Sequence, residues 1–593
     1  MSFNWTILGV KFVATETGSD PDLDKAHQAF PKPANGAESV LVGLKFHGVD
    51  YLFANAGTDF PPIIEALCNL PSSTMPHPVT VPHETASMGM AHGYFLVTGR
   101  PQAVMVHVNV GLANAVMGVI NAASDNIPVL VMSGRTPITE FGRQGSRMSP
   151  IQYGQEMFDQ SSLVSDTVKY HYEMRYPEQG EPLVSRALAL AKSEPAGPTY
   201  LSLPREPLTE KIGDAQQMPF TARPAASCSF PDPEQIRQMA DLLDKAKAPL
   251  ILVQRGDVQG RLSIALQAFS LKHSIVVCEP FPVRNVMPSA HSMFVGHDVK
   301  SALADADLIV ALDCDIPWLE AVHRLPAITP IVHIGPDPHF SRMPVRGYKT
   351  DLALQSDPVA AVLALDQAIS NPLPGAEDRK RAISKRNASR HEKINALIDK
   401  GNGSPIGAEW LSRCISDVMD DAAIVFSELG VLPGMMQLKG PNRVFANPHS
   451  GGLGWAMTAA LGAQLADRDR LVIACIGDGS YVFANPTACH QIAEALQLPV
   501  LTIIKNNGMW NAVRRSVVDS YPDGNAARTN DMPLTSLEPS PDYLKIAEAS
   551  RAYTERVERG EDLPAALARA VRVIREEKRQ VLLEVRSAVS DSF

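Results

Sequence analysis

Short apolar runs rich in valine, isoleucine and leucine alternate with helix-like segments along almost the whole of this 593-residue chain. Such runs are typical of strands buried in a parallel sheet, because helices cover both faces of such a sheet. The alternation therefore predicts an α/β fold. Since the chain is several times the length of an ordinary domain, we expect three doubly wound parallel-sheet domains.

Two interruptions divide this alternation. Proline, alanine and serine gather at residues 219–235, and a charged polar stretch, either an exposed helix or a linker, begins after about residue 365. The expected segments are an N-terminal arm (1–35), a first domain (36–215), a central domain (225–370), a linker (371–404) and a third domain (405–593). The expected strands lie at 102–110, 127–134, 197–207, 249–254, 274–280, 306–314, 330–335, 422–430, 471–477, 499–507 and 580–587. The first and third domains are candidates for a shared fold.

Charge and cysteine content narrow the function classes. The formal net charge is −10 and no lysine- or arginine-rich run stands out, so no nucleic-acid or anionic-membrane surface is indicated. The seven cysteines show no CxxC pair and no metal-type spacing, which fits reduced thiols in a cytoplasmic protein. The first residues lack the features of a signal peptide, and no apolar run reaches the roughly 18 residues of a membrane span.

Polar residues follow two strands of the third domain, in "LVIACIGDGS" and "PVLTIIKNNG". Asp478 and Asn507 stand at these strand ends, and the interval between them is about that of a strand–helix–strand crossover, which brings both to one edge of the sheet. Gly477 and Gly479 allow the backbone to approach a ligand, and Ser480 could meet a phosphate. Carboxylate and amide oxygens suit Mg²⁺ or Ca²⁺ completed by phosphate oxygens. The pattern predicts a divalent-metal diphosphate site, although GDG alone would more often be a plain turn.

GDG followed by NN in this arrangement resembles the thiamine diphosphate motif of the acetolactate synthase, pyruvate oxidase and benzoylformate decarboxylase superfamily. The resemblance extends over residues 36–593, in the order pyrimidine-binding, central and diphosphate-binding domain. It implies thiamine diphosphate as cofactor. It also implies that Asp478, Asn507 and the carbonyl of Met509 hold Mg²⁺ against the diphosphate.

Just upstream, "HSGGLGWAMTAALGAQLADRDRLVIACIGDGS" resembles benzoylformate decarboxylase closely. By that similarity, the carbonyl of Gly451 accepts a hydrogen bond from the 4′-amino group of the cofactor, and Leu453 props the cofactor in a bent shape. A loop of small residues with one bulky apolar side chain suits this role. The alternative is ordinary glycine-rich packing of a helix on a sheet.

Activation of such a cofactor needs a carboxylate against the aminopyrimidine ring. Glu84 in "VPHETASMGMAHGYFLVTGRP" matches the glutamate motif of the superfamily almost position for position. Taken alone, it would be an exposed glutamate at a helix start. In the superfamily this glutamate reaches the cofactor of a neighbouring subunit, so the resemblance implies a homodimer or a homotetramer with active sites at subunit interfaces.

The substrate side rests on two histidines and a hydroxyl. His107 and His291 match the two catalytic histidines of benzoylformate decarboxylase, and two histidines converging over the cofactor could exchange protons near neutral pH. As alternatives, His291 makes a domain contact and His107 only shapes its loop. Thr58, in "NAGTDFPPI", matches a serine that binds the substrate carboxylate in that enzyme.

Departures from benzoylformate decarboxylase indicate a different substrate. The segment 133–160 is longer and more polar than its counterpart, and Gln155 within it is similar to the glutamine region of acetolactate synthases. Tyr153, Trp510 and Asn511 are further candidates for the substrate pocket, with plain core packing as the alternative for each.

The sequence thus predicts a lyase that acts on a 2-oxo acid or a diketone through an enamine bound to the cofactor, with an aldehyde as a possible acceptor. The first hypothesis is that the enzyme catalyses non-oxidative decarboxylation or carboligation, because His107 and His291 are present. An acetolactate synthase-like carboligase or a diketone-cleaving hydrolase is the second. A non-catalytic regulatory or FAD-binding relative is a third, disfavoured because Glu84 and Asp478 are present; no phosphate motif in the central domain decides whether FAD binds.

Overall fold

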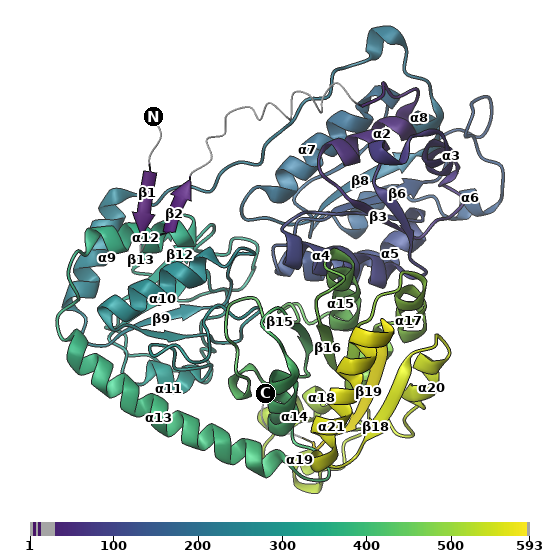
Figure 1. Cartoon of the computed structure of the whole chain (residues 1–593). Coiled ribbons are helices and arrows are strands. Elements are labelled where there is room, and N and C mark those ends of the chain that lie inside the picture. The colour runs from purple at the N-terminus through teal and green to yellow at the C-terminus, as the bar shows by residue number, and fades with distance from the viewer. Residues whose placement is uncertain (1–3, 8–9, 14–29, 590–593) are drawn as a thin grey trace.

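The computed structural model describes residues 4–7, 10–13 and 30–589. Three parallel sheets follow one another along the chain, each flanked by helices (Figure 1). The predicted three-domain α/β architecture is therefore confirmed. A short antiparallel pair, β1 (Asn4–Ile7) and β2 (Val10–Val13), lies within the arm and is drawn beside the central sheet.

The first sheet has the strand order β4-β3-β5-β6-β8-β7, and its pairs are all parallel. Its strands are β3 (Tyr51–Ala54), β4 (His77–Thr80), β5 (Ala103–Val106), β6 (Leu130–Arg135), β7 (His171–Glu173) and β8 (Thr199–Pro204). Its helices are α2 (Gly36–Phe46), α3 (Pro61–Asn69), α4 (Glu84–Thr98), α5 (Val108–Ser124), α6 (Ile151–Gly154), α7 (Gly180–Lys192) and α8 (Arg205–Thr209).

The central sheet has the order β10-β9-β11-β12-β13. Its strands are β9 (Pro249–Val253), β10 (Val276–Cys278), β11 (Leu308–Leu312), β12 (Ile331–Gly335) and β13 (Leu352–Gln355). Its helices are α9 (Pro233–Lys245), α10 (Arg261–His273), α11 (Val299–Leu303) and α12 (Pro358–Ala368). The charged stretch that follows is helical over α13 (Ala376–Gly401), which runs along the outside of the molecule (Figure 1).

The third sheet has the order β15-β14-β16-β17-β19-β18. Its strands are β14 (Ile424–Glu428), β15 (Val444–Ala446), β16 (Val472–Gly477), β17 (Leu501–Asn506), β18 (Tyr553–Val557) and β19 (Val581–Arg586). Its helices are α14 (Ala408–Val418), α15 (Trp455–Ala466), α16 (Asp478–Phe483), α17 (Pro486–Ala495), α18 (Asn511–Ser520), α19 (Asn525–Thr529), α20 (Tyr543–Glu548) and α21 (Leu563–Arg572). Numbered within each domain, the first and third sheets both have the order 2-1-3-4-6-5, so these two domains share a fold.

The first and third domains pack through α4 and α15, which cross at close range because small residues face each other. A Cβ atom on Gly89 would lie 1.8 Å from Oγ1 of Thr458, and one on Gly462 would lie 1.9 Å from the carbonyl oxygen of Met90. Residues of both domains therefore form one continuous apolar cluster. The absence of side chains at these glycines sets the distance between the two sheets.

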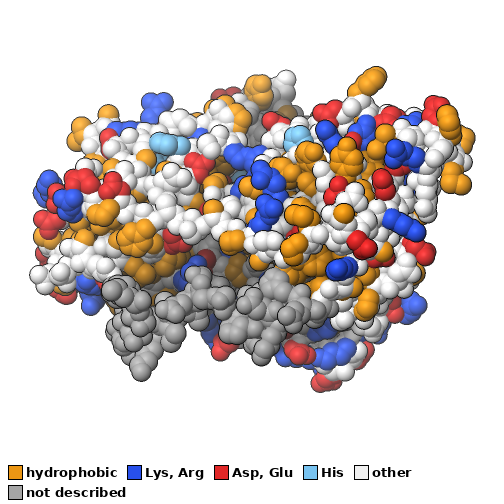
Figure 2. Space-filling model, turned by 90° about the horizontal axis from the view of Figure 1, so that it is seen from above, with side chains coloured by type: hydrophobic (Ala, Val, Ile, Leu, Met, Phe, Trp, Pro, Cys, Tyr) orange, Lys and Arg blue, Asp and Glu red, His pale blue; other side chains and the backbone are white. Residues whose placement is uncertain are grey.

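The molecular surface is mixed in character. On the face shown in Figure 2, basic and acidic side chains are interspersed, with apolar side chains scattered between them. Within the described residues, no helix combines the length and the apolar character that a membrane span requires.

Candidate active site

The carboxyl ends of β16 and β17 bring the predicted metal ligands together. The two strands are parallel neighbours, and Gly477 pairs with Lys505 at their ends. Asp478 accepts a hydrogen bond through Oδ2 from the backbone N–H of Gly508 at 2.8 Å, so the loop after β17 is tied to the loop after β16. Asn507 accepts a hydrogen bond through Oδ1 from the N–H of Met509 at 3.2 Å.

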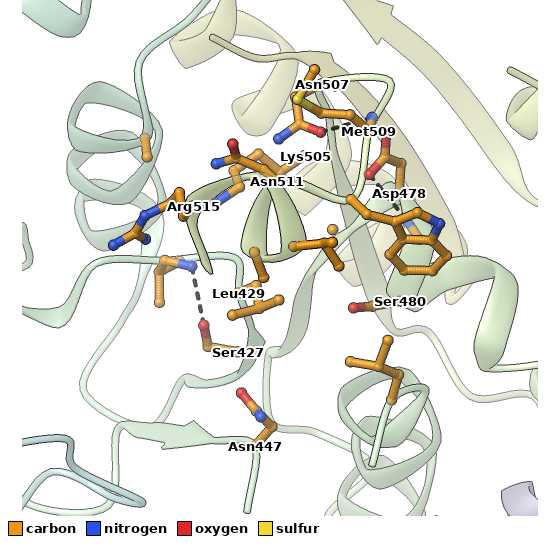
Figure 3. A pocket seen from close by; sticks show the side chains of 18 of the residues that line it. Ser427, Leu429, Asn447, Asp478, Ser480, Lys505, Asn507, Met509, Asn511 and Arg515 are labelled. Carbon is orange, nitrogen blue, oxygen red and sulfur yellow. Dashed lines mark hydrogen bonds between the residues drawn. The ribbon is translucent and has the colours of Figure 1, made fainter. Parts of the chain in front are cut away.

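A cavity of 340 Å³ opens at this edge of the third sheet (Figure 3). The predicted residues that line it are Leu453, Gly477, Asp478, Gly479, Ser480, Asn507, Met509, Trp510 and Asn511. Lys505 and Arg515 also line it, and no sequence pattern singles out either residue. The structure thus gathers in one cavity most of the residues predicted to hold metal and diphosphate.

Asp478 is suited to a cation. Its side chain is buried, and it forms no ion pair with a basic residue in the described part of the chain. Burial raises the pKa of Asp478, while hydrogen bonds from backbone amides, including those of Gly479 and Gly508, act in the opposite direction. A buried carboxylate beside an amide oxygen and backbone carbonyls is a donor set that Mg²⁺ accepts when phosphate oxygens complete its shell. The residues present fit a metal diphosphate.

Trp510 forms one wall of this cavity. A Cβ atom on Gly479 would lie 2.1 Å from the indole ring of Trp510, so only glycine fits at that turn. The ring of Phe483 meets the indole edge to face at 5.8 Å between centroids. The indole therefore packs against the predicted diphosphate loop.

The loop before α15 is anchored by a residue that the sequence did not indicate. Glu428, at the end of β14, is fully buried and accepts hydrogen bonds from the N–H groups of Gly454 at 2.7 Å and Ala456 at 2.8 Å. Burial raises the pKa of Glu428 to about 7. These bonds fix the backbone directly after Gly451 and Leu453. Leu453 projects into the cavity, as expected for an apolar wedge, whereas Gly451 lies exposed with a φ of 69°.

Glu84 begins α4 and is 5% exposed. Its two carboxylate oxygens accept hydrogen bonds from the side-chain amides of Asn55 at 2.9 Å and Asn114 at 3.2 Å. Gly111 passes so close that a Cβ atom there would lie 3.1 Å from Oε1 of Glu84. The carboxylate is therefore held in one orientation at the strand ends of the first domain.

His107 ends β5 beside this carboxylate, and Asp59 holds it. Nδ1 of His107 donates to Oδ1 of Asp59 at 2.5 Å, and the N–H of Val108 donates to Oδ2 of Asp59 at 3.1 Å. Nε2 of His107 is left as an acceptor and faces Nε2 of Gln155 at 3.1 Å. The φ of Val108 is 33°, a strained value for a β-branched residue, and such strain is often found at functional sites.

Family models match all three domains. The N-terminal thiamine pyrophosphate-binding domain of thiamine pyrophosphate enzymes matches residues 34–163, the central domain of these enzymes matches residues 236–365, and their C-terminal thiamine pyrophosphate-binding domain matches residues 430–585. The chain belongs to the thiamine pyrophosphate enzymes. It is therefore an enzyme that depends on thiamine diphosphate, as the sequence resemblance implied.

Similar proteins include both kinds of enzyme named in the sequence analysis. The chain is 23% identical over 571 residues to the acetolactate synthase large subunit of Lactococcus lactis subsp. lactis, covering 93% of this chain and 92% of that protein. It is 26% identical over 499 residues to benzoylformate decarboxylase of Pseudomonas aeruginosa, covering 79% and 85%. The solved structure of a thiamine diphosphate-dependent 4-hydroxybenzoylformate decarboxylase from Rhodococcus jostii RHA1 has the same fold, with a TM-score of 0.73 at 23% sequence identity; the match covers 94% of this chain and 100% of that chain.

In this thiamine diphosphate enzyme, the predicted activating residue, Glu84, and the predicted diphosphate cavity of one chain are separate. Neither Glu84 nor His107 lines the cavity at β16 and β17. His291 lies in the central domain between β10 and α11, where its Nδ1 accepts a hydrogen bond from the N–H of Met293 at 3.3 Å. Burial lowers the pKa of His291. Among the described residues of one chain, no hydrogen bond joins His291 to His107, and their convergence over the cofactor stays a prediction.

The remaining pocket candidates lie near His107. Thr58 is exposed and directly precedes Asp59, whereas Tyr153 is 51% exposed and its ring is covered by the guanidinium of Arg147 at 4.7 Å from the centroid. Gln155 is buried, and its Oε1 atom has no hydrogen-bond partner in the described structure. An unpaired buried acceptor beside His107 is suited to a hydroxyl or amide donor of a ligand.

Asp59 is a positioning residue for His107, which gives a first prediction. We expect Asp59→Asn to lower kcat by about 100-fold or more with little change in KM, because the amide no longer fixes the tautomer of His107. The pH profile of kcat should shift as well, which a purely structural role would not require. The double variant Asp59→Asn/His107→Ala should be no slower than His107→Ala. Full activity in Asp59→Asn would contradict the assignment.

Where the three domains meet, a series of ion pairs extends to the loop that contains Gly451. Arg255 of the central domain bonds to Asp125 of the first domain at 3.3 Å and to Asp315 at 2.7 Å. His449, two residues before Gly451, lies with Nδ1 3.0 Å from Asp315 and with Nε2 3.0 Å from the carbonyl oxygen of Phe281. Both ring nitrogens of His449 face acceptors, so the protonated ring is the form that the contacts favour.

This contact predicts a pH-dependent stability. Burial acts to lower the pKa of His449, but the hydrogen bond and the charge of Asp315 outweigh it and raise the pKa, with Arg255 opposing. A raised pKa in the folded state means that the stabilisation is complete below the pKa of an unfolded histidine and is lost as pH rises through the folded value. The difference in melting temperature between the wild type and His449→Gln should therefore be largest at mildly acidic pH and shrink towards alkaline pH. A difference that does not vary with pH would contradict the pairing.

Proposed function

We propose that the chain is a thiamine diphosphate- and Mg²⁺-dependent lyase that acts on a 2-oxo acid by non-oxidative decarboxylation, by carboligation or by both. The observation that carries the proposal is the position of His107 beside Glu84. Gly111 links the two, since its N–H donates to the carbonyl of His107 at 2.7 Å while its Cα faces the Glu84 carboxylate. A histidine that can exchange protons thus lies within one helical turn of the activating carboxylate.

Each residue has a separate task. Thiamine diphosphate, when bound, supplies the carbanion that attacks the substrate carbonyl and takes up the electrons released with CO₂. Glu84 exchanges a proton with the aminopyrimidine ring, and its two amide partners keep it aligned. His107 delivers protons to the substrate through Nε2, and Thr58 offers a hydroxyl to the substrate carboxylate. Asp478, Asn507 and Met509 would hold Mg²⁺.

A second subunit completes the active site in this proposal. Glu84 is absent from the cavity that holds the diphosphate ligands of its own chain. The segment that carries Gln155 also exposes large apolar side chains, with Phe141 84%, Met148 83% and Phe158 111% exposed. Contiguous exposed apolar groups beside a site are typical of an interface. We therefore propose a cytoplasmic homodimer or homotetramer in which the first domain of one chain faces the third domain of another.

A second candidate is an acetolactate synthase-like carboligase or a diketone-cleaving hydrolase. This second candidate is favoured by Gln155. The side chain of Gln155 contacts His107, so a substrate pocket lined by histidines alone has less room. Both candidates share the cofactor chemistry and differ in the substrate bound at His107 and Gln155.

A substrate screen tests the proposal. The purified enzyme with thiamine diphosphate and Mg²⁺ is incubated with 2-oxo acids and diketones, alone and with aldehydes, and CO₂ and products are measured by mass spectrometry. We expect CO₂ release from at least one 2-oxo acid. Cleavage of diketones without CO₂ release would favour the second candidate, and a flavin band in the absorption spectrum would add FAD. No product from any compound would contradict the lyase assignment.

A further inference from the structure

Lys505 is a cation in the predicted diphosphate cavity that neither the sequence pattern nor the family motif accounts for. It directly precedes the paired asparagines and is the penultimate residue of β17. In the sheet it lies opposite Gly477 of β16. Its side chain lines the same cavity as Asp478 and Asn507 (Figure 3). The strand that supplies a metal ligand thus also supplies a positive charge.

The ammonium of Lys505 has few direct partners among the described residues, and Asp478 and Glu409 attract it only at longer range. Lys505 is partly buried, and its Nζ donates one long hydrogen bond, of 3.4 Å, to the carbonyl oxygen of Gly430. It forms no ion pair with any residue that the structure describes. A partly buried cation without a bound anion lowers the stability of the folded protein, because burial removes part of its hydration.

The wall nearest to Lys505 offers few other donors to an anion. The loop after β14 presents Val431 and Leu432 to the cavity, and neither side chain can donate a hydrogen bond. Their backbone N–H groups already donate to the hydroxyl oxygens of Ser427 at 3.0 Å and Ser412 at 2.8 Å. Val431 and Leu432 therefore leave Lys505 as the donor that this wall offers to an anion.

We propose that Lys505 binds the diphosphate group of the cofactor directly, as a protein cation that acts in addition to the divalent metal. This inference rests on the proposed position of the diphosphate at Asp478 and Asn507. A diphosphate suits the site, because Lys505 lines the same cavity as Asp478, Gly479 and Ser480, the residues predicted to hold metal and phosphate. Charge-assisted hydrogen bonds from lysine to phosphate oxygens are among the strong ones.

Binding measurements on Lys505→Met test the inference. Thiamine diphosphate, inorganic pyrophosphate and thiamine are titrated by calorimetry into the full-length wild type and the variant, with Mg²⁺ and again with EDTA. We expect Lys505→Met to weaken binding of thiamine diphosphate and of pyrophosphate by about 10- to 100-fold, because one hydrogen bond to a charged group is lost. Thiamine, which carries no phosphate, should bind both proteins equally. The matched control is Lys439→Met, an exposed lysine of the same domain, which should change nothing.

Stability of the cofactor-free protein separates this role from a structural one. Without cofactor, Lys505→Met should melt no lower than the wild type, since the methionine removes an uncompensated charge. The rise in melting temperature on adding thiamine diphosphate should be smaller in the variant than in the wild type. Equal affinity of variant and wild type for thiamine diphosphate would overturn the inference, as would an equal loss of thiamine binding. If the wild type itself bound no thiamine diphosphate, the proposed cofactor site would be wrong instead.

Discussion

Replacing Glu84 by glutamine is expected to lower kcat at least about 100-fold while leaving the affinity for thiamine diphosphate almost unchanged. Glutamine keeps the size of the side chain and can still meet Asn55 and Asn114, but it cannot exchange a proton with the aminopyrimidine ring. The measurements are steady-state turnover and the rate of hydrogen–deuterium exchange at C2 of the bound cofactor, followed by NMR. The exchange rate should fall with kcat.

Glu65→Gln provides the matched control, because Glu65 is an exposed glutamate of the same domain. Its kcat and its C2 exchange rate should equal those of the wild type. Rapid C2 exchange in Glu84→Gln would show that another group activates the cofactor.

The same variant tests whether two chains share each site. If Glu84 of one subunit serves the diphosphate cavity of another, mixing Glu84→Gln with Asp478→Ala during refolding or co-expression restores activity. Half of the dimers would then pair unlike chains, and each of these would have one intact site, so we expect about a quarter of wild-type activity. No recovery in verified mixed dimers would place the whole site within one chain.

Replacing Asp478 by alanine is expected to weaken the binding of Mg²⁺ and thiamine diphosphate by about 100-fold or more. The variant loses the only carboxylate among the three predicted metal ligands, and it loses the acceptor that ties Gly508 to Gly479. Activity at low cofactor concentration should vanish. Calorimetric titration with thiamine diphosphate at several Mg²⁺ concentrations is the measurement.

Asp469→Ala, at an exposed aspartate before β16, is the control and should bind both ligands normally. Because the Asp478 carboxylate is buried and its pKa is raised, Asp478→Ala should fold, and its cofactor-free form should melt close to the wild type. Wild-type affinity in this variant would refute the metal assignment.

Much of the fold could be predicted from the sequence because most strands of the three sheets are buried on both faces. Runs such as those of β16 and β17 are apolar throughout, and their predicted and observed limits agree within about two residues. Five of the six edge strands were not predicted, β10 being the exception, and neither was the inner strand β3. β7 and β18 are short, partly exposed and interrupted by polar residues, so they carry no continuous apolar run. The domain limits drawn from the sequence remain predictions.

The gathering of Asp478 and Asn507 at one sheet edge could also be predicted, because two adjacent parallel strands place consecutive loops side by side. Asp59, Glu428 and Lys505 could not, since their significance lies in contacts that sequence spacing does not reveal. Asp59 precedes its partner His107 by a whole strand–helix–strand unit, and Glu428 contacts a loop beyond the next strand. The convergence of His291 with His107 stays a prediction, since the described contacts of His291 are local ones.

The crossing of α4 and α15 also bears on the origin of the chain. Each helix follows the second strand of its domain. The contacts between the helices are reciprocal, since Gly93 of α4 faces Ala459 of α15 and Gly462 of α15 faces Met90 of α4. Gly89 and Thr458 face each other at the same crossing. An arrangement in which a contact occurs twice with exchanged partners has an approximate two-fold axis. The chain is thus built like a dimer fused into one polypeptide. Glu84, predicted to transfer protons, lies in one half, and Asp478, predicted to anchor the metal diphosphate, lies in the other, so the proposed site needs both halves.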